Sequence, residues 1–106
     1  TGIPFLGHGD HPLFMRRMGA VMGEVAGIRR CGSASIDLAW VASGRLDGFW
    51  EEPLNPWDIA AGIVLIREAG GFVTDLDGRD RMFETGGIVA GNENVHRRLT
   101  AILAKA

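Results

Sequence analysis

One helical segment, residues 59–66, carries no charged and no strongly polar side chain on any face. A helix that is apolar on all sides is typical of a helix buried between other layers of a fold. The residues from Glu68 to Gly71 follow it and end in two glycines, which suit a left-handed helix cap. We therefore predict a buried central helix around which the rest of the chain packs.

Glycines divide the remaining sequence into short periodic segments. The apolar periodicity predicts further helices over residues 12–25, 36–42 and 93–103, and strands over residues 28–30, 46–51, 72–75 and 87–90. Helices and strands alternate along most of this order. Such alternation predicts a single layered α-β-α domain, an α/β fold spanning residues 1–106, with a mostly parallel sheet between the helices.

The composition argues against two classes of partner. The formal net charge of −2 gives no basic field that could hold a nucleic acid. The longest apolar run has about eight residues, whereas crossing a bilayer takes roughly 20. The one cysteine, Cys31, cannot form an internal disulfide, which is typical of a reducing compartment. We therefore expect a cytoplasmic protein with no nucleic-acid and no membrane partner.

Two carboxylates lie near the start of the central helix. Asp58 directly precedes the apolar run, where a helix N-terminus offers unpaired N–H groups and a partial positive charge. Glu51 stands seven residues earlier, at the carboxyl end of a predicted strand, which is where open α/β sheets place their ligands. The two side chains are predicted to meet at one cavity mouth. A plain N-cap role for Asp58 is the alternative.

A turn of small residues, Gly32-Ser33-Ala34-Ser35, leads into the helix predicted over residues 36–42. Small residues let the backbone approach a ligand closely, and free N–H groups at such a turn suit an anion or a hydroxyl. Helix capping by Ser33 or Ser35 explains the same residues equally well. The turn is therefore a candidate binding element with an open structural alternative.

Two further polar clusters are not interpreted as metal sites. His8, Asp10 and His11 lie in a segment without the regular framing that metal sites usually have. The three aspartates within residues 75–80 resemble the start of a calcium loop, but the closing glutamate is not at the required distance. We predict a solvated turn there.

Four motifs occur in a fixed order along the chain: Gly-Ser-Ala (32–34), Phe-Trp-Glu (49–51), Pro-Trp-Asp-Ile-Ala-Ala-Gly (56–62) and Glu-Ala-Gly-Gly (68–71). Together they resemble the inositol monophosphatase family of magnesium-dependent phosphatases, and most closely its bacterial branch. The first five residues look like the segment that opens the carboxyl-terminal half of that family. The resemblance implies the fold of that carboxyl-terminal subdomain.

The resemblance also implies roles for five residues. Asp58 matches a metal ligand of the family, which implies Mg²⁺ as the cofactor, and a hard Mg²⁺ ion suits carboxylate oxygens. Glu51 matches a residue that contacts substrate hydroxyls. Gly32, Ser33 and Ala34 match the turn that lines the substrate pocket. A small phosphorylated polyol such as an inositol phosphate is the implied substrate, released as inositol and phosphate.

One departure from the family bears on the mechanism. The family's other metal ligands lie in a Glu-Glu site and an Asp-Pro-x-Asp-Gly-Thr motif, and this sequence contains neither. Asp58 alone cannot hold the ions that activate water for hydrolysis. We therefore expect the carboxyl-terminal part of a phosphomonoesterase, inactive alone, whose partner is the missing amino-terminal half or further copies of the chain. A non-catalytic binding or interaction module that kept the fold is the alternative.

Overall fold

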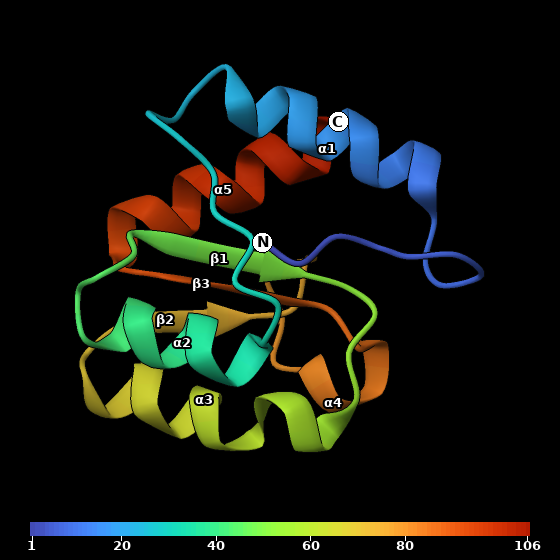
Figure 1. Cartoon of the computed structure of the whole chain (residues 1–106). Coiled ribbons are helices and arrows are strands. Elements are labelled where there is room, and N and C mark those ends of the chain that lie inside the picture. The colour runs from blue at the N-terminus through green and yellow to red at the C-terminus, as the bar shows by residue number, and fades with distance from the viewer.

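A computed structural model describes all residues, 1–106. Its elements, in chain order, are α1 (His11–Met22), α2 (Ala34–Ala42), β1 (Gly48–Glu51), α3 (Pro56–Glu68), β2 (Phe72–Thr74), α4 (Met82–Thr85), β3 (Ile88–Gly91) and α5 (Glu93–Lys105). Helices α2 and α3 cover one face of the sheet, and α1 and α5 lie over the other face (Figure 1). The predicted α-β-α layering is present.

The sheet is antiparallel, so the prediction of a mostly parallel sheet is wrong. The strand order is β1-β3-β2, and β3 pairs antiparallel with both neighbours. In the register Trp50 lies opposite Val89, and Val73 lies opposite Ala90. The crossover through α3 does leave β1 and β2 running in the same direction. They are not adjacent, however, because β3 returns between them in the opposite direction.

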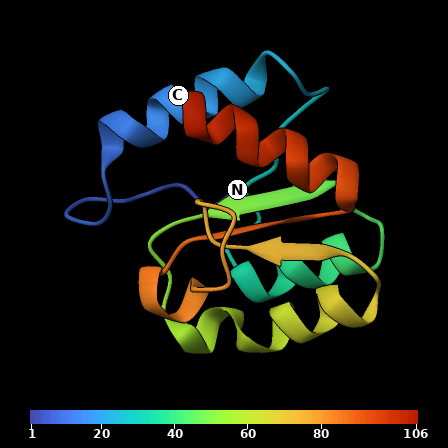
Figure 2. The ribbon, with the colours of Figure 1, turned by 180° about the vertical axis from the view of Figure 1, so that it is seen from behind.

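Each face of the sheet has its own hydrophobic cluster. Successive side chains of a strand point to opposite faces, and in β1 the buried Phe49 joins one cluster while the buried Trp50 joins the other. The first cluster includes Leu38 of α2 and Ile63 of α3. The second is formed mainly with α1 and α5, and Figure 2 shows α5 crossing the sheet on that side. All four residues of β3 are buried, so the central strand is covered on both faces.

Helix α3 is not buried on all sides, which corrects the predicted central helix. Its buried residues follow helical spacing along one stripe: Ile59, Gly62, Ile63 and Ile66. Val64 and Leu65 are apolar but exposed, at 57% and 46% of their surface. The sheet and α2 cover only one side of α3, so its outer side carries apolar residues without a partner in this chain.

Two local predictions need correction, and one short helix was missed. Residues 28–30 form no strand, because the Arg29 carbonyl accepts one hydrogen bond, from the Thr1 amino group at 3.1 Å, and no strand pairs with the segment. The short helix α4 was not predicted. The turn predicted to be solvated is exposed over residues 77–80. Asp75 at its start is only 1% exposed, and its Oδ1 accepts the N–H groups of Asp77 and Arg79 at 2.9 Å each.

No helix of the structure has both the length and the apolar character needed to span a lipid bilayer.

The packing of α2 on α3 generates a stability prediction at Gly62. A Cβ at this position would overlap the Leu38 side chain, with Leu38 Cβ only 2.6 Å away. Alanine is normally the better helix former, but here overpacking should dominate and lower the free energy of unfolding by about 1–3 kcal/mol. Urea denaturation of Gly62→Ala would measure the change.

Gly19→Ala in α1 is the matched control, because a Cβ there meets no atom within 4 Å. It should stabilise the protein by about 0.5–1 kcal/mol. Equal stability changes in the two variants would contradict the packing account.

Candidate functional site

A pocket of about 400 Å³ lies where the N-termini of α2 and α3 approach the end of β1. It is lined by Phe5, His8, Gly32, Ser33, Ala34, Ser35, Glu51, Pro53, Leu54, Asn55 and Asp58. All five residues singled out in the sequence line this one pocket, although their roles remain predictions. The residues that the sequence analysis missed are mainly those of the loop at Phe5 and His8 and of the segment before Asp58. Phe5 lies in the segment that resembles the family, and His8 was named only in a cluster that was rejected as a metal site.

The first wall of the pocket is the turn that starts α2. Gly32 has φ of +84°, a left-handed conformation that suits glycine. Ser33 is the N-cap of α2, and its Oγ accepts the N–H of Ile36 at 3.4 Å. Ser33 therefore caps the helix and lines the pocket at once, so the two alternatives considered for this turn are compatible.

The second wall is the start of α3. The helix begins at Pro56, earlier than predicted, so Asn55 is the N-cap and Asp58 lies in the first turn. Asp58 Oδ2 accepts the Asn55 N–H at 3.1 Å, while Oδ1 accepts no hydrogen bond. Ser35 Oγ donates to the backbone carbonyl of Asp58 at 3.2 Å and ties the starts of α2 and α3 together. Two helix N-termini thus border one pocket, an arrangement that favours an anionic ligand.

Glu51 stands at the end of β1 and is half-buried. The backbone of Gly2 lies directly against its carboxylate, because a Cβ at Gly2 would overlap the carboxyl group. Burial, followed by the charge of Asp37, raises the pKa of Glu51 above its ordinary value of 4.5. Asp37 is itself 1% exposed, and neither of its carboxylate oxygens has a hydrogen-bond partner. The ionised Glu51 side chain offers acceptors only, which suits ligand hydroxyls.

The donor set in this pocket fits part of a Mg²⁺ site. Mg²⁺ prefers octahedral oxygen coordination and is commonly held by one or two carboxylates together with waters and substrate phosphate. Asp58 Oδ1 is free to act as one such ligand. No three His, Cys, Asp or Glu side chains gather anywhere in the chain in a metal-binding arrangement. The remaining protein ligands of a complete site would have to come from outside these 106 residues.

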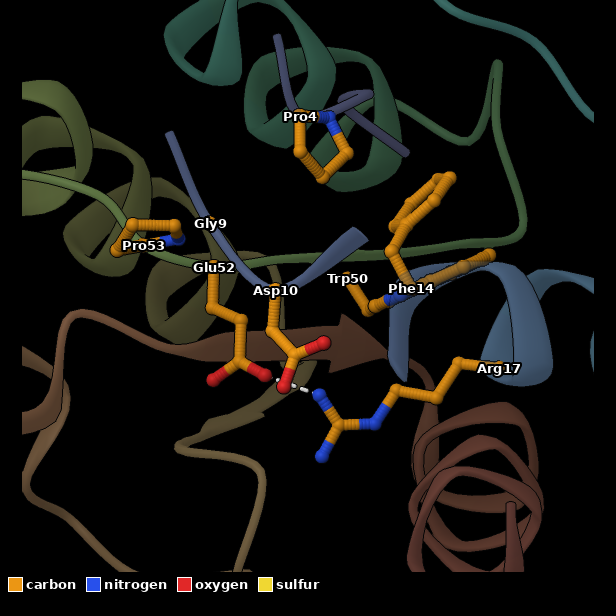
Figure 3. A pocket seen from close by; sticks show the side chains of 8 residues that line it. All are labelled: Pro4, Gly9, Asp10, Phe14, Arg17, Trp50, Glu52 and Pro53. Carbon is orange, nitrogen blue, oxygen red and sulfur yellow. Dashed lines mark hydrogen bonds and ion pairs between the residues drawn. The ribbon is translucent and has the colours of Figure 1, made fainter. Parts of the chain in front are cut away.

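A second cavity, of about 260 Å³, shares Pro53 with the first pocket, and Figure 3 shows the side chains that line it. Its lining includes Asp10, Trp50 and an ion pair between Arg17 of α1 and Glu52. This pair joins α1 to the residue that follows Glu51, so it fixes the loop between the two cavities. This ion pair could not be predicted from the sequence, because its partners are 35 residues apart.

The raised pKa of Glu51 predicts a pH-dependent stability effect. In the unfolded chain Glu51 ionises near its ordinary pKa, and in the folded chain it holds its proton to higher pH. The folded state therefore loses stability as pH rises from about 4.5 through the raised pKa. Glu51→Gln should be more stable than the wild type at about pH 7, and the difference should fade towards about pH 4.5.

Urea denaturation between about pH 4 and pH 8 would measure this difference. Glu84→Gln, at an exposed position of α4, is the control and should show no such trend. A Glu51→Gln variant that is less stable than the wild type at neutral pH would contradict the assigned burial of Glu51.

Comparisons with known proteins identify the family of the chain. The family model described as "Inositol monophosphatase family" matches residues 8–106. An inositol-1-monophosphatase from Mesorhizobium japonicum is 56% identical over 104 residues, which cover 98% of this chain and 39% of that protein. The Nus factor SuhB from Escherichia coli K12 is 48% identical over 101 residues, which cover 95% of this chain and 38% of that protein.

A solved structure is similar over almost the whole chain. The crystal structure of the extragenic suppressor protein suhB from Bartonella henselae superimposes with a TM-score of 0.95 at 50% identity, covering 99% of this chain and 40% of that one. The chain thus spans about two fifths of the length of the relatives it matches. With most of its residues inside the family model, the chain belongs to the inositol monophosphatase family.

Proposed function

We propose that the chain is the carboxyl-terminal part of a Mg²⁺-dependent phosphomonoesterase that hydrolyses an inositol phosphate or a closely related polyol phosphate. The observation that carries the proposal is the pocket itself, in which Glu51, Asp58 and the Gly32–Ala34 turn converge. An acceptor-only carboxylate facing two helix N-termini matches the chemistry of a ligand with hydroxyls at one end and phosphate at the other.

Each side chain has a definite task in this proposal. Glu51 accepts hydrogen bonds from the polyol hydroxyls and so orients the ring. The N–H groups of the turn at Gly32 to Ala34 border the ligand on the α2 side. Asp58 supplies the free Oδ1 as one metal ligand while its Oδ2 keeps the start of α3 in place. Bound Mg²⁺ would supply charge neutralisation of the phosphate and activation of water.

The outer surfaces of α2 and α3 support a partner that completes the site. These two helices expose five large apolar side chains: Ile36, Trp40, Trp57, Val64 and Leu65. Exposed apolar surface of this kind typically marks a contact with another chain or segment. We propose that the part of the enzyme absent from this chain covers it and brings the remaining metal ligands to Asp58. A second copy of this chain would cover the surface too. It would bring only the residues that this chain already has, however, and so none of the missing metal-ligand motifs.

A reconstitution assay tests the proposed function. The purified chain is mixed with the part of the Mesorhizobium japonicum relative that it does not match, and phosphate release from inositol 1-phosphate is followed with Mg²⁺. We expect no release from the chain alone and release from the mixture. Asp58→Asn should lower that release about 100-fold or more, because a metal ligand stabilises transition-state charge by several kcal/mol.

Asp47→Asn, at an exposed position outside the pocket, is the matched control and should leave the rate unchanged. Release by the chain alone would show that it already holds a complete site. A mixture that forms a complex but releases no phosphate would favour the non-catalytic binding module instead.

A further inference from the structure

We propose that His8 donates a hydrogen bond directly to the phosphate group of the ligand bound in this pocket. The inference rests on the proposed function, because it assumes that the pocket takes a polyol monophosphate. It assigns the phosphate-binding role to a residue of the loop that precedes α1, a segment in which the sequence motifs single out no ligand contact.

The charge distribution of the pocket motivates this assignment. Of the lining residues, Glu51 and Asp58 are acidic, and His8 is the one side chain that can carry a positive charge. The Arg30 guanidinium lies beside Gly32 and its charge acts on Glu51, but Arg30 is not part of the lining. A phosphate monoester carries close to two negative charges at neutral pH and needs hydrogen-bond donors. Among the lining side chains, His8 is the donor best suited to it.

The hydrogen bonding of the three histidines separates His8 from the others. His11 Nε2 lies 2.9 Å from the Phe5 carbonyl oxygen and 3.1 Å from that of His8, so it holds the loop together. His96 Nε2 lies 2.8 Å from Thr74 Oγ1. The ring nitrogens of His8 have no hydrogen-bond partner within the protein. A neutral imidazole has one N–H donor and a protonated one has two, so His8 has a donor available in either state.

The loop also restricts the motion of the His8 ring. The rings of Phe5 and His8 are stacked, with centroids 4.5 Å apart and planes 3° from parallel. The backbone N–H of His8 donates to the Phe5 carbonyl oxygen at 2.9 Å, and this hydrogen bond closes the turn. Asp10 then caps α1 by accepting the Leu13 N–H at 2.9 Å. A ring held by stacking on one side and by a closed turn loses little further freedom on binding a ligand.

Two ligands and two variants test the assignment. Calorimetric titrations of the 106-residue chain with Mg²⁺ present compare inositol 1-phosphate with free inositol. His8→Phe keeps an aromatic ring for stacking on Phe5 but removes both nitrogens. We expect it to weaken binding of inositol 1-phosphate about tenfold, as for one lost charge-assisted hydrogen bond, and to leave binding of inositol unchanged. His8→Lys should retain most of the affinity for inositol 1-phosphate.

His96→Phe, outside the pocket, is the matched control and should bind both ligands like the wild type. Equal affinity of the wild type and His8→Phe for inositol 1-phosphate would overturn the assignment. If Glu51→Gln weakened binding while His8→Phe did not, the proposed function would stand without the role assigned to His8. An equal loss for both ligands in His8→Phe would also overturn the assignment, because it would indicate a hydroxyl contact. A wild-type chain that binds neither ligand would overturn the assignment, whereas the proposed function would still be decided by the reconstitution assay, which supplies the missing metal ligands.

Discussion

The close packing of α2 on α3 is the contact on which the rest of the site depends. Gly62 allows it, because the Leu38 side chain occupies the space that any Cβ at this position would fill. The two helices therefore lie near enough for Ser35 at the start of one to donate to the Asp58 carbonyl at the start of the other. Their N-termini meet at a single pocket as a result, and the positive ends of both helix dipoles act on the same ligand.

The sheet supplies the third side of this arrangement. The central strand β3 is buried on both faces and fixes β1 by antiparallel pairing, so Glu51 reaches the pocket from the end of a rigid element. The ion pair between Arg17 and Glu52 holds the residue that directly follows Glu51. Binding groups that come from rigid elements in this way keep their geometry before a ligand arrives, which lowers the cost of binding.

Local motifs predicted five residues that share one pocket, but they did not predict the sheet topology. The motifs around Ser33, Glu51 and Asp58 depend on residues close in sequence, and the structure brings all three to one pocket. Whether neighbouring strands run parallel or antiparallel depends on where β3 inserts in the sheet. The alternation of helices and strands along the chain does not predict that position.

The apolar stretch of α3 predicted burial on every side, whereas Val64 and Leu65 are exposed in this chain. Their pattern is consistent with a neighbour that lies outside the 106 residues. His8 was considered only within a cluster rejected as a metal site, because its place in the pocket lining depends on the fold of the loop and not on a motif.

The central claim is that this chain carries the polyol-binding part of a phosphatase site in one preformed pocket. Backbone amide chemical shifts recorded by NMR during titration with inositol 1-phosphate and Mg²⁺ test it most directly. The account predicts that the largest changes fall on Gly32 to Ser35, on Glu51 and on Asp58, with little change around Arg17 in the neighbouring cavity. Changes concentrated around Arg17 and Asp10, or none in the turn that starts α2, would contradict it.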